Sequence, residues 1–247
     1  ARAAGVERFV VPGVDPRNWD RVVGLRETTG VSVALGIHPW VLRSLDSDGL
    51  NRALEALPIQ AARHAAAIGE VGFDRSLRGE VSLDEQRRVL LAHRAVAEDQ
   101  SLPLILHVVG EHGAALEALE AGGPLAAGGT VHSFSGNAAL VPRYEALNLH
   151  LSFAGGVARA QAKKPRAAAA AVSRDRLLIE TDAPDQPLAK GARNEPAMLP
   201  KIAVAIAECR HCSVEEVASA TFENAEALFV RGRVHEERGA FGDSSTR

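Results

Sequence analysis

The sequence has few cysteines, little net charge and no long apolar run. Its 247 residues include two cysteines, Cys209 and Cys212, too few for a disulfide framework, which favours a reducing, cytoplasmic location. No stretch approaches the roughly 18 consecutive apolar residues that a membrane span requires. The formal net charge is −3, so a nucleic-acid partner would have to be held by a local site rather than by general attraction. Membrane-spanning and disulfide-stapled classes are therefore excluded.

Aromatic residues are also scarce, at 4% of the chain. Trp19 and Trp40 are too few for an aromatic platform that stacks along a single strand of nucleic acid. Apolar residues make up 46% and charged residues 24%, which is ordinary for a globular protein. Because no change in composition marks a linker, we expect one monomeric domain over residues 1–247, with a polar, frayed tail at about 231–247.

Short apolar runs of strand length recur along the chain, each followed by a longer helical stretch. They lie at 8–13, 31–38, 66–70, 102–107, 129–132, 149–154 and 177–182. Their spacing brackets the roughly 30 residues of a βα unit, and their near-continuous apolar character is typical of parallel strands covered on both faces. No glycine-rich dinucleotide fingerprint follows the first run, which favours a closed barrel over an open sheet.

Helix signals occupy the segments between these runs. Ser82 with Glu85 forms a capping-box pattern that predicts a helix to about residue 98. Ser213 with Glu216 predicts another, running to about residue 230. The alanine run 167–171 follows Pro165 and is interpreted as a further helix. Alternating strands and helices of this kind predict an α/β fold, a TIM (β/α)8-type barrel.

The strand count falls one short of the eight that a closed barrel needs. Residues 1–5 read as the last turn of a helix that ends on Gly5. We therefore expect an N-terminally truncated barrel, whose first strand is not in this chain.

Four of the runs stop on a side chain that can bind a metal or transfer a proton: Glu70, His107, His132 and Asp182. The carboxyl ends of barrel strands meet at one mouth, so these four residues are expected to share a site. Two imidazoles and two carboxylates suit one or two divalent cations, with Zn, Mn and Mg not distinguishable. Such an ion lowers the pKa of a bound water, and Asp182 would hold or deprotonate that water. Metal-dependent hydrolysis is the predicted reaction, with Glu70 and Asp182 as catalytic residues.

Several other polar residues are expected at the same mouth. His38 ends the second run, and Arg193 with Asn194 follows the last one, where barrels often bind phosphate. These three residues are candidate substrate contacts, with a structural role as the alternative for each. Asp74 is expected to orient the loop that carries Glu70.

The motifs that surround these residues resemble one family along nearly the whole chain. GIHPW (36–40), AIGEVGFD (67–74), LPLILH (102–107), TVHSFSG (130–136) and LLIETDAPDQP (178–187) are similar in order and spacing to the TatD family of metal-dependent hydrolases. The resemblance implies a TIM barrel with a divalent metal site, and a deoxyribonuclease. It also implies that Glu70 is shared by two metals, that His107 and His132 bind one of them, and that Asp182 binds the other.

Two features of the family pattern are missing. No His-x-His pair, which in the family ends the first strand, occurs in the sequence, and Val108 and Val109 stand where the family commonly has an arginine. The absent pair coincides with the absent strand, so the chain as given is expected to be impaired. Three functions remain open: hydrolysis of phosphodiester bonds in DNA or a small substrate, hydrolysis of an amide or lactone, and an inactive truncated scaffold.

Overall fold

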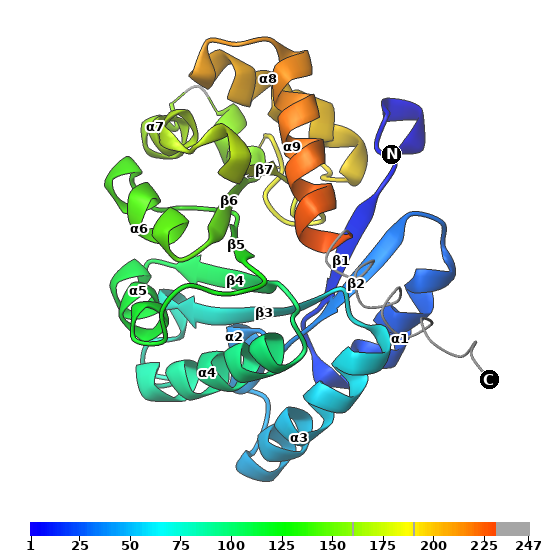
Figure 1. Ribbon diagram of the computed structural model, residues 1–247, viewed down its shortest axis with the longest axis vertical. Helices are drawn as coiled ribbons and strands as arrows, with labels where there is room; N and C mark the ends of the chain where they lie inside the picture. The colour runs from blue at the N-terminus through cyan, green and yellow to red at the C-terminus, as the bar shows by residue number, and fades with distance from the viewer. Residues whose placement is uncertain (160, 190, 231–247) are drawn as a thin grey trace, which may run out of the picture.

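The chain forms a curled, seven-stranded parallel sheet with helices packed around its outside (Figure 1). The structure, a computed structural model, describes residues 1–159, 161–189 and 191–230. The polar tail expected at 231–247 lies outside the described residues. The strands are β1 (Phe9–Gly13), β2 (Val31–Leu35), β3 (Ala67–Asp74), β4 (Leu104–Val109), β5 (Gly129–His132), β6 (Leu149–Phe153) and β7 (Leu177–Ile179). Each predicted run thus overlaps a strand, and the α/β fold of TIM-barrel type is confirmed.

The strands follow one another in the sheet in the order of the chain, from β1 to β7. Every neighbouring pair is parallel. Among the described residues, β1 pairs only with β2 and β7 only with β6, so the sheet curls into a barrel that is open between these two strands. The parallel arrangement brings all carboxyl ends of the strands to one rim, which we call the mouth.

Nine α-helices connect or follow the strands in the described part of the chain. They are α1 (Trp19–Gly24), α2 (Pro39–Leu42), α3 (Ser47–His64), α4 (Leu83–Asp99), α5 (His112–Glu120), α6 (Val141–Ala146), α7 (Lys163–Ala171), α8 (Leu199–Arg210) and α9 (Val214–Phe229). Within the described residues, none of the helices combines the length and the apolar character that crossing a bilayer requires.

The predicted helix starts are confirmed at the level of single hydrogen bonds. Ser82 Oγ accepts a hydrogen bond of 3.1 Å from the Glu85 amide and caps α4. Ser213 and Glu216 form the reciprocal capping box of α9. Residues 2–4 form a short 3-10 turn that ends on Gly5 in the left-handed conformation, as the glycine signal predicts.

Alternation along the strands separates an outer apolar core from the interior of the barrel. Leu104 and Leu106 of β4 belong to the large core between the sheet and the helices, whereas Ile105 joins a separate small cluster with Ala34 and Ala67. Because successive side chains of a strand point to opposite faces, His107 lies on the same face as Ile105. The interior of the barrel is therefore apolar toward the amino-terminal ends of the strands and polar at the mouth.

Candidate metal centre

Neighbouring strands place the two histidines of the site side by side. In the parallel register, His107 of β4 is directly opposite His132 of β5, and Gly72 of β3 is opposite His107. Glu70 lies two residues before Gly72 and therefore on the same face of β3. The sequence predicts that a strand ends at Glu70, but β3 continues to Asp74 and its register against β4 shifts between Ile68 and Val71.

Three donor atoms meet at this point. His132 Nε2 lies 3.2 Å from Glu70 Oε2 and 3.1 Å from His107 Nδ1. All three residues are buried, and they come from three consecutive strands. Ligand atoms held about 2.0–2.1 Å from one tetrahedral ion stand roughly 3.3 Å apart, so both distances from His132 Nε2 are compatible with a first-row divalent cation.

A carboxylate faces the other ring nitrogen of each imidazole. His107 Nε2 is 2.9 Å from Asp74 Oδ2, and His132 Nδ1 is 3.6 Å from Glu180 Oε1. Asp74 also accepts a hydrogen bond of 2.7 Å from the indole of Trp40, and Glu180 accepts one of 2.8 Å from Ser152. A carboxylate at hydrogen-bond distance, such as Asp74, holds the ring nitrogen that it contacts protonated, which leaves the other nitrogen free to bind a metal. Glu180 lies beyond hydrogen-bond distance of His132 and acts on the ring through its charge.

The charges at this cluster favour a cation. Burial alone would raise the pKa of the Glu70 carboxyl, but His132, with His38 and His107, lowers it to about 2. Burial alone would lower the pKa of His132, but the carboxylates of Glu70 and Glu180 raise it well above its ordinary value. The carboxylates of Glu70 and Glu180 on either side of His132 thus favour a positive charge at this ring. A divalent cation would supply such a charge, and its binding to an imidazole nitrogen releases any proton held there.

His38 faces the same cluster from the start of α2. With Glu70 and His107 it forms a trio whose potential ligand atoms lie within 4.8 Å of one another. Its Nδ1 accepts a hydrogen bond of 3.1 Å from the Trp40 amide, so the neutral ring carries its proton on Nε2, which is 3.7 Å from Glu70 Oε2. Burial, together with nearby His107, lowers the pKa of His38 to about 3, so the ring is neutral. His38 is therefore better suited to donate a hydrogen bond into the site than to bind an ion.

Asp182 lies beyond the end of its strand. The sequence predicts a run to Asp182, but β7 ends at Ile179, and Asp182 adopts a left-handed backbone conformation with φ of 55°. Burial, then the charge of Glu180, raises the pKa of Asp182 to about 6, with smaller effects from His132 and Glu70. The charges of the cluster therefore influence the pKa of Asp182, which places this carboxyl group beside the cluster.

The last two candidates sit in the segment after β7. Asn194 is buried, and its side-chain amide donates a hydrogen bond of 2.6 Å to the Thr181 carbonyl and another to the Asp185 carbonyl. It therefore holds the loop that carries Asp182. Arg193 is 87% exposed and lies 3.6 Å from Glu195. The structure does not bring Arg193 into contact with the donor atoms.

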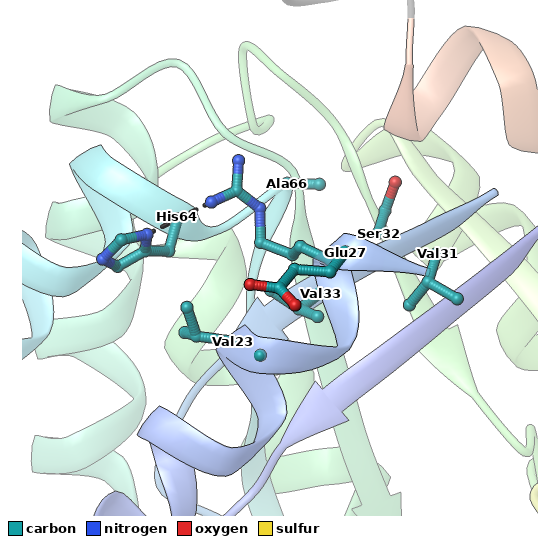
Figure 2. A pocket seen from close by; sticks show the side chains of 9 residues that line it. Val23, Glu27, Val31, Ser32, Val33, His64 and Ala66 are labelled. Atoms are coloured by element: carbon teal, nitrogen blue, oxygen red, sulfur yellow. Dashed lines mark hydrogen bonds between the residues drawn. The ribbon is translucent and has the colours of Figure 1, made fainter. Parts of the chain in front are cut away.

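A pocket of about 510 Å³ lies at the opposite end of the barrel (Figure 2). Its lining includes Val31 and Val33 of β2 and the side chain of His64, at the end of α3. These residues precede or begin strands, so the pocket belongs to the amino-terminal face of the barrel rather than to the mouth. His64 Nδ1 is engaged there with Arg26 Nη1 at 3.2 Å.

Glu180 has a role that the sequence analysis missed, and Asp74 has a different role from the expected one. Asp74 holds the ring of His107 rather than the loop of Glu70. A signal was present for Asp74, since residues 72 and 74 alternate on one face of the same strand as Glu70. Because only the last residue of each apolar run was considered as a ligand, the supporting roles of Asp74 and Glu180 were not predicted.

We expect that replacing Asp74 by asparagine weakens binding of Zn²⁺ or Mn²⁺ by about 10- to 100-fold, because an uncharged amide no longer holds His107 in its metal-binding form. Competition with a fluorescent chelator measures this change. Asp99→Asn, at the exposed end of α4, is the control and should bind the ion as the wild type does. An unchanged affinity in Asp74→Asn would show that Asp74 does not support the site.

The barrel and its buried His/Glu cluster at the mouth define a metal-dependent hydrolase. The chain belongs to the TatD family: the sequence profile described as TatD-related DNase matches residues 1–230.

Relatives span most of the chain. YabD, an uncharacterized metal-dependent hydrolase of Bacillus subtilis (strain 168), is 35% identical over 233 residues, which cover 93% of this chain and 89% of YabD. The 3′-5′ ssDNA/RNA exonuclease TatD of Cronobacter sakazakii is 29% identical over 239 residues, covering 94% and 89%. The crystal structure of the TatD homologue YjjV from Escherichia coli K12 aligns with a TM-score of 0.79 and 30% identity, covering 92% of this chain and 87% of YjjV.

Proposed function

We propose that the protein hydrolyses phosphodiester bonds at the 3′ end of single-stranded nucleic acid. The observation that carries the proposal is the convergence of Glu70 and His107 on His132, whose Nε2 lies 3.2 Å from Glu70 Oε2 and 3.1 Å from His107 Nδ1. A relative that is 29% identical over nearly its whole length is named a 3′-5′ ssDNA/RNA exonuclease, which supports this substrate class.

Glu70 Oε2, His107 Nδ1 and His132 Nε2 would hold the ion. A divalent cation bound there supplies a Lewis acid that polarises a phosphoryl oxygen and lowers the pKa of water. Asp74 and Glu180 would keep the two imidazoles in the orientation that places His107 Nδ1 against His132 Nε2 and His132 Nε2 against Glu70. Glu70 and Asp182 would also face a second ion, but two ligands are too few to hold a first-row ion tightly.

The remaining groups handle the proton and the substrate. The pKa of Asp182 is about 6, so its carboxyl group is ionised at neutral pH. Because this pKa lies near 7, a carboxylate oxygen of Asp182 would accept a proton from the attacking water. His38 Nε2–H would donate to a phosphoryl oxygen, since its Nδ1 is already used by the backbone. Asn194 would act by holding the Asp182 loop, and Arg193 would contact a more distant phosphate from the rim.

The test is hydrolysis of a 5′-labelled single-stranded oligonucleotide with Mg²⁺, Mn²⁺ or Zn²⁺ supplied in turn. We expect shortening from the 3′ end by the wild type and none above background by His132→Ala purified in parallel. Cyclic amides and lactones, assayed under the same conditions, should not be hydrolysed. Equal shortening by His132→Ala, or turnover of an amide or lactone without shortening, would contradict the proposal.

The expectations of a single domain, a monomer and a cytoplasmic location stay predictions.

A further inference from the structure

Trp40 differs from the other tryptophan in its surroundings. Trp19 is 4% exposed, and its indole nitrogen donates to the Gly13 and Gly36 carbonyls inside the core. Trp40 leaves 47% of its surface exposed, although it lies in the four-residue helix α2 that begins directly after His38. An exposed indole is common on protein surfaces, but this one stands at the rim of the metal centre.

The contacts of Trp40 place it against the site. Its ring centroid is 5.0 Å from that of His38 and 6.1 Å from that of His107, with interplanar angles of 72° and 67°. Neither imidazole is parallel to the indole, so neither stacks on it. The indole nitrogen donates a hydrogen bond of 2.7 Å to Asp74 Oδ2, which fixes one edge of the ring.

We infer that Trp40 stacks on the terminal nucleobase of the substrate, which makes it the residue that distinguishes a nucleotide end from a bare phosphodiester. An aromatic ring that is anchored at one edge and open to solvent offers a rigid stacking surface for any base. One ring cannot follow a strand, but it suffices for the single base next to the bond that is cut. This inference rests on the proposed function and adds the group that the site recognises.

Trp40 also has a supporting role that must be separated from stacking. Through Asp74 it helps to hold His107, so any substitution of Trp40 can disturb the metal centre. Loss of this support should slow the hydrolysis of every substrate equally. Loss of stacking should slow only substrates that carry a terminal base.

The experiment therefore compares two oligonucleotides, one with an ordinary 3′-terminal nucleotide and one with a 3′-terminal abasic site. The proteins are the wild type, Trp40→Phe, Trp40→Leu and, as the control for an exposed aromatic residue, Phe222→Leu in α9. We expect the wild type to favour the base-bearing end by about 10-fold in kcat/KM, within the range of base–aromatic stacking. Phe222→Leu should keep this preference, Trp40→Phe should retain most of it, and Trp40→Leu should lose it.

Failure of the inference and failure of the proposed function give different results. If the wild type shortens both oligonucleotides but shows no preference, or if Trp40→Leu keeps the preference, the inference is wrong and the proposed function stands. If no oligonucleotide is shortened with any metal, the proposed function fails. Binding of the dinucleotide dTpdT then decides the inference: quenching of tryptophan fluorescence in the wild type that disappears in Trp40→Phe supports it, and no quenching overturns it.

Discussion

Replacement of Glu70 by glutamine is expected to lower kcat/KM for phosphodiester hydrolysis by about 10³-fold, or about 4 kcal/mol, the size of a lost metal-ion contribution. The amide keeps the shape of the side chain but removes the charge that lies 3.2 Å from His132. Two imidazoles alone are too few ligands for a first-row ion. The bound metal should therefore fall toward zero, as measured by elemental analysis of the dialysed protein.

The matched control is Glu55→Gln, an exposed glutamate of α3. It should retain the metal content and the activity of the wild type. Circular dichroism should show that both variants are folded, because Glu70 lies on the inner face of β3 and outside the large apolar core. Full metal content and wild-type turnover in Glu70→Gln would show that Glu70 is not a metal ligand.

The free energy of unfolding is expected to fall by about 3 kcal/mol between pH 7 and pH 4 because of His93 alone. His93 is buried in α4, where its Nδ1 donates to the Val89 carbonyl at 2.8 Å and its Nε2 accepts from the Ile37 amide at 3.0 Å. Burial lowers its pKa from 6.5 to about 4. Below pH 6.5 the unfolded chain binds a proton that the folded protein excludes, so stability is lost as the pH falls toward 4 and the loss then levels off.

The measurement is urea unfolding of metal-free wild type and His93→Gln at a series of pH values. Glutamine can make both hydrogen bonds but does not titrate, so the variant should lose about 3 kcal/mol less than the wild type over this range. Other buried histidines titrate in both proteins and cancel in the comparison. Parallel pH profiles for the two proteins would contradict the assignment.

Much of the fold was accessible from local patterns. The seven apolar runs and the two serine caps each correspond to an element of the structure, because parallel strands are buried on both faces and capped helices begin at fixed positions. The exact ends of the strands could not be predicted from local patterns. β3 extends past Glu70 and β7 stops before Asp182, because pairing with a neighbouring strand, rather than residue type, sets where a strand ends.

The candidate site divides in the same way. Strand-end residues pointed to Glu70, His107 and His132, and the register between β4 and β5 brings the two histidines together. The second pair of carboxylates, Asp74 and Glu180, and the indole of Trp40 were not foreseen in these roles. Their roles depend on which ring nitrogen each of them faces, and spacing along the chain carries no such information.

Residue types, their periods and the motifs were therefore enough for the class of fold, the kind of chemistry and three of the proposed metal ligands. The three-dimensional arrangement was needed to show that His107 presents Nδ1 and His132 Nε2, that His38 faces Glu70 as a hydrogen-bond donor, and that Trp40 lies at the rim. The physical reason is that hydrogen-bond direction and burial arise between segments far apart in the chain. A local pattern specifies which groups are present, and packing specifies which atom of each group is free to react.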